Sequence, residues 1–528
     1  MTPITDLPSE LLEPILSLLS FSSLSTLSRT CKILHAYLSP RIYHTIDWTW
    51  EDDQPCPPFH FLLRTLLANT QLAGLVRVLK FRGGGIVRED AWKDGSLCDD
   101  ECDWQSMESA RSVWTDGQRA RSSFKREDEW RVEDCVSQIY NARIKEWMSE
   151  FDRGNIDVVV ALILGQLQAL EQLDLGFGFV QRSRFVPQLF RHYTVNHRSL
   201  VPYRLLVSAN LALDGPRSPQ GFWSDLDLYR LFFFLPSLRT LNTILIEPVI
   251  FAWPSPMMRP QTVSLSSLCL RKCTASGDTL SRILSHTSQL KHLVYDHHRM
   301  VMCYPPHWEC EPQIYDPPTG WRRVSINCDG LSKALSYVRH TLQTLEIKVQ
   351  FTPSILIELK DKSNMLFLCG LIGRITHLPL MTRLTSLEIP WVLLSGWILN
   401  PVYEGKDADI PMWRHNNENF NNLHWPSVLP ASLTRLRLRD DLSDFGTFQF
   451  GGNMPIALIE QLLETKTTYL RELVDLEFVF IWNRKYEYEG CPLSLVKELR
   501  IVCHKYGVGC RIWQEQVLWK SKAAVEIQ

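Results

Sequence analysis

The spacing of apolar positions near the start of the chain predicts two short helices. Leucine and isoleucine recur at helical intervals between positions 11 and 19, and apolar residues do so again from Leu24 to Leu38. Pro14 removes one backbone hydrogen bond and is expected to kink the first helix, while Pro40 is expected to end the second. The apolar faces of this hairpin are too large for so short a segment to bury alone. We therefore expect the hairpin to contact a partner or another part of the chain.

From about residue 62 a second pattern begins, in which leucine recurs as L-x-x-L-x-L. Each L-x-L predicts a short strand whose alternate residues point into a shared core. Helical stretches such as residues 276–286 and 329–337 lie between the strands. The clear instances are Leu170/Leu173/Leu175, Leu265/Leu268/Leu270, Leu290/Leu293/Tyr295, Leu342/Leu345/Ile347, Leu384/Leu387/Ile389, Leu433/Leu436/Leu438 and Leu473/Leu476/Phe478, and a weaker one is Leu75/Val78/Leu79/Phe81.

The spacing of these strands predicts a repeat architecture. Leu268 and Leu293 are 25 residues apart, a length typical of one leucine-rich repeat. The intervals of 52 residues from Leu293 to Leu345 and of 49 residues from Leu387 to Leu436 are each close to two such units. A strand and a helix per unit build a curved solenoid with the strands on its concave side. The expected fold class is α/β: a helical N-terminal domain, then a solenoid of degenerate leucine-rich repeats with loop insertions.

These patterns divide the chain into four segments. The predicted domains are a helical domain at 1–48, a connecting helix and first repeat at 49–83, a charged and partly helical insertion at 84–155, and the repeat domain at 156–528, with insertions near 297–320 and 400–428. Long loops in repeat proteins are usually functional or disordered.

The composition of the chain argues against several classes of function. Its 528 residues are 45% hydrophobic and 22% charged, which is ordinary for a folded soluble protein. A net charge of -2 and a pI near 6.7 argue against a nucleic-acid partner or a membrane partner. The best apolar run, Val158 to Leu164, is too short to span a bilayer, and the N-terminus lacks the pattern of a secretion signal. The 14 scattered cysteines are then expected to be reduced, in a cytoplasmic or nuclear protein.

A search for catalytic and metal-binding motifs finds no strong candidate. The sequence lacks G-x-S-x-G, G-x-x-x-x-G-K-[ST], G-x-G-x-x-G and H-E-x-x-H, so we expect no catalytic residue and no cofactor. His297, His298, Cys303, His307 and Cys310 carry metal-ligand chemistry, but without the paired C-x-x-C spacing usual for zinc. A proline-rich surface loop is the favoured interpretation, and no metal is expected.

The N-terminal hairpin carries a more specific motif. Its residues read Leu7-Pro8-x-Glu10-Leu11-Leu12-x-x-Ile15-Leu16-x-x-Leu19, followed by Leu24-x-x-Leu27-Ser28-x-x-Cys31-Lys32. This segment resembles the F-box family, although that family's usual Trp after the Cys-Lys pair is replaced by Ile33-Leu34. The resemblance covers about 40 of the 528 residues. It implies docking onto a Skp-family adaptor, and through it onto a cullin, in a ubiquitin ligase. The residues expected to bind the adaptor are Leu7, Pro8, Leu11, Leu12, Ile15, Leu16, Leu19, Leu24, Leu27 and Cys31.

The whole layout is similar to the F-box/leucine-rich-repeat proteins of filamentous fungi. That resemblance implies a non-catalytic substrate receptor of an SCF-type ubiquitin ligase, whose repeats bind an unidentified protein substrate. The competing hypothesis is a leucine-rich-repeat scaffold outside any ligase. Its N-terminal hairpin would only cap the open end of the solenoid, which every repeat array requires.

The residues between the inward-pointing leucines of each strand are expected to face solvent and to form the substrate-binding surface. Arginines at positions 435, 437 and 439 alternate along one strand and could together bind an acidic or phosphorylated segment of a partner. The alternative is a solvated face neutralised by the aspartates at positions 440, 441 and 444. The candidate substrate-binding residues are Asp174, His292, Glu346, Lys348, Glu388, Arg435, Arg437 and Arg439.

Overall fold

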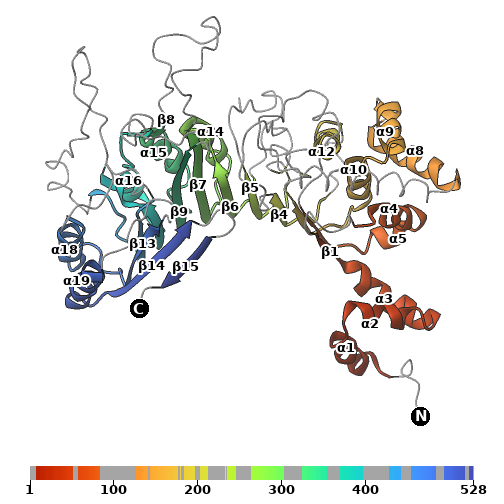
Figure 1. Ribbon diagram of the computed structural model, residues 1–528, viewed down its shortest axis with the longest axis horizontal. Coiled ribbons are helices and arrows are strands. Elements are labelled where there is room, and N and C mark those ends of the chain that lie inside the picture. The colour runs from red at the N-terminus through yellow and green to blue at the C-terminus, as the bar shows by residue number, and fades with distance from the viewer. Residues whose placement is uncertain are drawn as a thin grey trace, which may run out of the picture. The chain divides into compact units, whose positions relative to one another are not determined.

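The fold is described from a computed structural model of the chain, shown in Figure 1. The described residues are 7–50, 57–83, 126–140, 143–176, 179, 183–196, 203–211, 232, 235–244, 263–301, 324–353, 369–395, 427–441, 454–482, 493–517 and 522–526. The chain divides into two compact units, residues 1–242 and 243–528, and each is described by itself.

Three helices form the N-terminal head, which we define as residues 7–44. They are α1 (Ser9–Ser17), α2 (Phe21–Ser28) and α3 (Lys32–His44). Leu12 and Leu16 of α1 pack with Leu34 and Leu38 of α3 to form the core of the head. Burying four such side chains contributes about 1.5–3 kcal/mol each, which is enough to hold short helices together.

The second of the two predicted helices is not continuous. Cys31 adopts an extended backbone (φ -155°, ψ 160°) and separates α2 from α3, so a single helix from Leu24 to Leu38 is wrong. The Cys31 sulfur accepts the backbone N–H of Leu34 at 3.5 Å and thereby caps α3. Pro40 does not end α3, which continues to His44.

The first unit contains parallel strands that begin immediately after the head. β1 (Thr45–Trp50) pairs with β2 (Val78–Gly83), β2 with β3 (Gln172–Leu175), and β3 with β4 (Ser208–Leu211); β5 (Thr240–Ile244) follows β4 in the strand order. The sequence analysis missed β1 and ended the helical domain inside it. The reason is that Thr-Ile-Asp-Trp-Thr-Trp contains no leucine to match the repeat pattern.

An aromatic cluster joins β1 to the body of the first unit. The Phe59 ring lies 5.2 Å from Trp48, 4.9 Å from Phe81 and 5.9 Å from Phe179, measured between ring centroids. Trp48 and Phe81 are also register partners on β1 and β2. Edge-to-face packing of this kind adds to the free energy gained by burial alone.

Helices cover the rest of the first unit. They are α4 (Phe59–Ala68), α5 (Thr70–Ala73), α8 (Arg126–Tyr140), α9 (Ile144–Asp152), α10 (Ile156–Gln166) and α12 (Phe185–Asn196). α8 and α9 belong to the predicted insertion at 84–155, whose residues 84–125 lie outside the described residues. Trp147 of α9 is buried and donates to the Gln188 side chain of α12 at 3.3 Å. This helical part of the insertion therefore packs into the first unit.

Among the described residues of the second unit, seven parallel strands pair into one sheet. They are β6 (Ser267–Cys273), β7 (His292–Val301), β9 (Thr344–Pro353), β11 (Ser386–Pro390), β12 (Arg435–Arg439), β13 (Asp475–Trp482) and β14 (Gly509–Val517), paired in that order. β15 (Lys522–Glu526) adds an antiparallel edge to β14, and β8 (Val324–Asn327) pairs with β10 (Cys369–Ile372) in a separate small sheet. The helices of this unit are α14 (Gly277–Leu284), α15 (Cys328–Ser336), α16 (Trp391–Ser395), α18 (Met454–Lys466), α19 (Leu493–Lys505) and the short 3-10 helix η4 (Leu378–Leu380).

The strands predicted from L-x-L are confirmed, and their leucines are buried. The second and third apolar residues of each clear instance fall on β3, β6, β7, β9, β11, β12 or β13. The starts of β3, β4, β5, β7, β9, β11, β12 and β13 repeat one hydrogen-bond pattern. At β9, for example, the Lys291 carbonyl accepts the N–H groups of Gln343 (2.8 Å) and Thr344 (3.0 Å). This recurrence shows that the strands enter the sheet in the same way.

The interpretation of the long intervals as two units each is wrong. β7 pairs directly with β9, and Leu293 is the register partner of Leu345. β11 pairs with β12 in the same way. Each interval is therefore one step across the sheet, lengthened by intervening residues. The structure shows a helical head followed by a mixed α/β region with parallel strands, and a leucine-rich-repeat solenoid stays a prediction. Most of the predicted insertions near 297–320 and 400–428 lies outside the described residues.

Candidate functional site

The head exposes apolar side chains that its own core does not use. Leu11, Ile15 and Leu18 follow one another at helical spacing along α1 and its C-cap, and the Leu18 side chain is 87% exposed. Phe21 at the start of α2 and Ile33 in α3 are also exposed. Exposed apolar residues grouped on one small domain are typical of a protein-binding surface.

The ten predicted adaptor-binding residues divide into three groups by burial. Pro8, Leu11, Ile15 and Cys31 are exposed, and Leu7, Leu19, Leu24 and Leu27 are half-buried around the core. Leu12 and Leu16 are buried inside the head, which argues against a direct contact with any partner. The sequence analysis missed Leu18, Phe21 and Ile33. Helical spacing from Leu11 could have identified Leu18. Phe21 and Ile33 lie on the other two helices, α2 and α3, and that spacing does not reach them.

Polar contacts fix α1 against α3. Glu13 of α1 forms an ion pair with Arg41 and accepts a hydrogen bond from the Tyr37 hydroxyl at 3.3 Å. Ser20 caps α2 by accepting the backbone N–H of Ser23 at 3.2 Å. These contacts hold the exposed apolar side chains on a defined surface.

Comparison with known protein families identifies the head. Residues 4–47 match the family model described as F-box-like. This segment is an F-box-like domain. F-box domains in general bind Skp-family adaptors, and such a domain suggests an SCF substrate-recognition adaptor in general. The match ends inside β1 and covers none of the chain beyond residue 47. A search of curated proteins found no relative of this chain.

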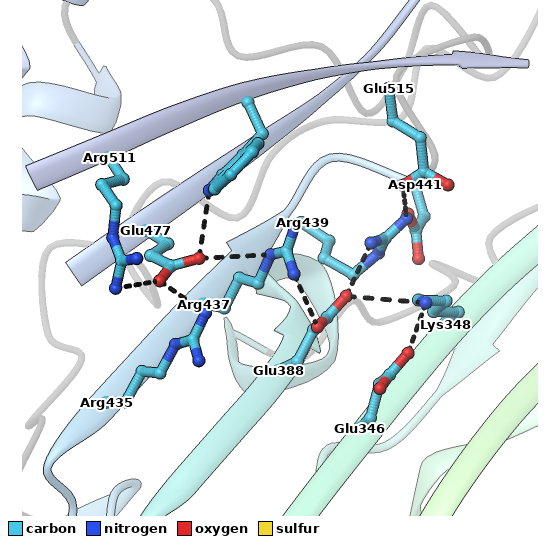
Figure 2. A network of polar contacts seen from close by, with 11 residues as sticks. Glu346, Lys348, Glu388, Arg435, Arg437, Arg439, Asp441, Glu477, Arg511 and Glu515 are labelled. Atoms are coloured by element: carbon cyan, nitrogen blue, oxygen red, sulfur yellow. Dashed lines mark hydrogen bonds and ion pairs between the residues drawn. The ribbon is translucent and has the colours of Figure 1, made fainter. Parts of the chain in front are cut away.

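The second unit contains a charged network on the strand face opposite the buried leucines, which we call the charged face (Figure 2). It comprises Glu346, Lys348, Glu388, Arg435, Arg437, Arg439, Asp441, Glu477, Arg511, Trp513 and Glu515. Parallel pairing places these side chains in rows: Glu346, Glu388, Arg437, Glu477 and Arg511 are successive register partners across five strands. Five cationic and five acidic side chains therefore meet on one face.

Arg439 lies at the buried end of the charged face. Its side chain is 1% exposed and donates to Glu388 (2.7 Å), Asp441 (2.8 Å) and Glu515 (2.7 Å). Burial alone would lower the pKa of Arg439, but the three carboxylates raise it above its ordinary value. Arg439 was predicted to face solvent, and that prediction is wrong because these carboxylates enclose it.

Glu477 organises the other end of the charged face. Its side chain is fully buried, and its Oε1 forms ion pairs with Arg435 Nη2 (2.7 Å) and Arg511 Nη2 (2.8 Å). Its Oε2 accepts from Trp513 Nε1 at 3.1 Å and lies 3.6 Å from Arg437 Nε. The Arg437 guanidinium also stacks on the Trp513 ring, 5.5 Å from its centroid.

The structure brings six of the eight predicted substrate-binding residues together. Glu346 and Lys348 pair with each other, and Lys348 Nζ also lies 3.9 Å from Glu388. Asp174 lies apart, buried in the first unit, where it accepts a hydrogen bond from Arg82 Nε at 3.0 Å. His292 lies on β7, exposed and outside the network. Whether any of the eight binds a substrate stays a prediction.

The aspartates named in the sequence analysis neutralise the arginines only in part. Of the nearby aspartates, Asp441 pairs with Arg439, while position 444 lies outside the described residues. Most of the neutralising carboxylates instead come from neighbouring strands. Arg511 and Glu515 were missed because β14 carries Cys510-x-Ile512 where the search required L-x-L. Glu477 was missed although it lies between Leu476 and Phe478 on β13, a strand that the pattern predicted.

The described residues also contain no group of three or more His, Cys, Asp or Glu side chains that could hold a metal ion. Of the metal-ligand candidates, Cys303, His307 and Cys310 lie outside the described residues. In the part of the chain that the structure describes, no helix is long and apolar enough to cross a membrane.

Proposed function

We propose that this chain is a substrate-recognition subunit of an SCF-type ubiquitin ligase. Its F-box-like domain binds a Skp-family adaptor and through it a cullin, and its α/β region binds a protein substrate. The observation that carries the proposal is the F-box-like match at residues 4–47, together with the exposed apolar side chains of the same residues.

The exposed residues of the head supply the binding free energy in this proposal. Burying one leucine, isoleucine or phenylalanine side chain contributes about 1.5–3 kcal/mol. Leu11, Leu18 and Phe21 could therefore provide much of the affinity of a specific complex, since each is more than half exposed in the chain alone. An apolar stripe on a helix is the feature that a hydrophobic groove in a partner recognises.

The α/β region supplies recognition rather than chemistry. We propose that its parallel strands and helices are degenerate leucine-rich repeats in a solenoid, in support of which the strand-entry hydrogen bonds recur across the sheet. Holding a substrate near a charged conjugating enzyme raises the effective concentration of its lysines. The chain therefore needs no catalytic residue or cofactor of its own.

Co-purification tests the proposal against a scaffold that never joins a ligase. Full-length chain and the variants Leu11→Asp and Leu380→Asp are expressed with an affinity tag, and the recovered adaptor and cullin are quantified. Leu11 and Leu380 are leucines of similar exposure, one in α1 and one in the η4 turn of the second unit. We expect Leu11→Asp to lose both partners and Leu380→Asp to retain them. If the wild-type chain recovers no adaptor, or if Leu11→Asp recovers as much as wild type, the scaffold hypothesis replaces this one.

A further inference from the structure

The positive charge of the charged face is concentrated at one end. Three guanidinium groups, those of Arg435, Arg437 and Arg511, surround the single buried carboxylate of Glu477. Asp475 lies 3.4 Å from Arg511, and Glu388 accepts a hydrogen bond from Arg437 at 3.3 Å. At the opposite end the balance reverses, because three carboxylates surround Arg439. Arg437 is shared between Glu388 and Glu477, whereas Arg435, Arg511 and the buried Glu477 carboxylate together carry one net positive charge, which Asp475 beside Arg511 offsets in part.

Arg435 and Arg511 are the members of this cluster that reach solvent. Their side chains are 42% and 40% exposed, whereas Glu477 is fully buried beneath them. Both Nη2 atoms contact the same Glu477 oxygen, so the two guanidinium groups lie close enough for one external oxyanion to bridge them. Among the described residues, Arg435 contacts no carboxylate other than Glu477, and the guanidinium of each arginine pairs with Glu477 through its Nη2 atom. Each guanidinium therefore retains donors for a further anion.

Glu477 positions this pair in advance of binding. Glu477 lies on the central strand β13, and its register partners are Arg437 on β12 and Arg511 on β14. The Trp513 indole holds the second Glu477 oxygen and stacks beneath Arg437. Two arginines held in this way lose little rotamer entropy when an anion arrives, which favours binding.

We propose that Arg435 and Arg511, held together by Glu477, bind a carboxylate of an acidic segment in the protein that this chain recognises. The inference rests on the proposed function, for which it names the class of substrate. A singly charged carboxylate matches the one net positive charge of Arg435, Arg511 and Glu477, and Asp475 beside Arg511 disfavours a doubly charged phosphate.

Peptide binding to the full-length chain tests this site. Fluorescence anisotropy is measured for a labelled peptide of alternating Glu and Gly, for the same peptide with Gln in place of Glu, and for one with phosphoserine in place of Glu. The protein variants are Arg435→Gln and Arg511→Gln, with Arg471→Gln as the control. Arg471 is an exposed arginine in the turn before β13, so its substitution removes the same charge outside the cluster.

We expect the Glu peptide to bind and the Gln peptide not to bind. Arg435→Gln and Arg511→Gln should each weaken binding by about tenfold or more, as for loss of a charged hydrogen bond, whereas Arg471→Gln should change it by less than about twofold. Equal binding of the Glu and Gln peptides, equal loss in all three variants, or binding of the phosphoserine peptide alone would overturn the proposal.

Adaptor recovery is measured on the same variants. Loss of peptide binding with adaptor retained rejects only this inference, whereas peptide binding without any adaptor rejects the proposed function.

Discussion

Arg439 and Glu515 form an ion pair of 2.7 Å that joins β12 to β14 across the intervening strand β13. Both side chains are buried, so water screens the attraction between them only weakly. Two further carboxylates, Glu388 and Asp441, contact the same guanidinium. Arg439 is thus the point at which three non-consecutive segments of the second unit meet.

Replacing Arg439 by methionine should destabilise the second unit strongly. The substitution leaves three carboxylates buried without their cation, and breaking a buried pair in this way costs about 3–5 kcal/mol. Chemical denaturation should show this loss for Arg439→Met. The exposed control Arg471→Met should change the free energy of unfolding by less than about 0.5 kcal/mol. Equal stability of the two variants would contradict the buried network.

The deficit of Arg439→Met should shrink as the pH falls. Burial raises the pKa of Asp441 above its ordinary value even with Arg439 present, and removing the cation should raise it further. A carboxyl with a raised folded-state pKa binds protons more tightly when folded, so its contribution to stability grows as the pH falls through that pKa. The difference in unfolding free energy between Arg439→Met and wild type should therefore be smaller at a pH just above the ordinary pKa range of carboxyl groups than at neutral pH. A pH-independent difference would contradict this assignment.

Gly277 of α14 and Gly330 of α15 lie against each other, which provides a test of how the two helices pack. A Cβ on Gly277 would lie 2.5 Å from the backbone carbon of Gly330, which is too close for either helix to keep its position. Gly277→Ala should lower the free energy of unfolding by about 1–3 kcal/mol. Gly74→Ala is the control, because the nearest atom to its Cβ would be at 3.4 Å. Wild-type stability of Gly277→Ala would show that the two helices do not meet there.

The aromatic cluster after the head can be tested with two phenylalanines of the same helix. Phe59 is buried among Trp48, Phe81 and Phe179, whereas Phe61, two residues later in α4, is exposed. Phe59→Ala should cost about 3–5 kcal/mol, measured by denaturation of the full chain. Phe61→Ala should cost much less. Similar losses for both would mean that the cluster does not anchor β1.

The sequence predicted the strands well because each depends on a local pattern. Leu387 and Ile389 are buried as the L-x-L rule requires, and the same holds along the sheet. β1 and β14 escaped prediction because aromatic residues or Cys510 replace leucine in them. The burial of Arg439 could not be predicted either, since its carboxylate partners Glu388 and Glu515 lie 51 and 76 residues away in sequence.

In the head too, residue spacing alone could not predict which side chains are buried. Helical spacing correctly grouped the apolar residues of α1, yet it could not separate buried Leu16 from exposed Leu11 without the position of α3. An aspartate at Leu16 would unfold the head, so loss of binding in that variant would carry no information about the surface. Variants at exposed positions are therefore the informative ones.

The most direct test of docking through the F-box-like domain is calorimetric titration of the purified full-length chain with a purified Skp-family adaptor. Ile33 of α3 and Ile501 of α19 are both 67% exposed isoleucines in helices, so Ile33→Asp and Ile501→Asp form a matched pair. If the F-box-like domain is the docking element, Ile501→Asp should bind as wild type, and Ile33→Asp should bind at least about tenfold more weakly. Equal affinity of the two variants, or no binding by the wild-type chain, would contradict docking through this domain.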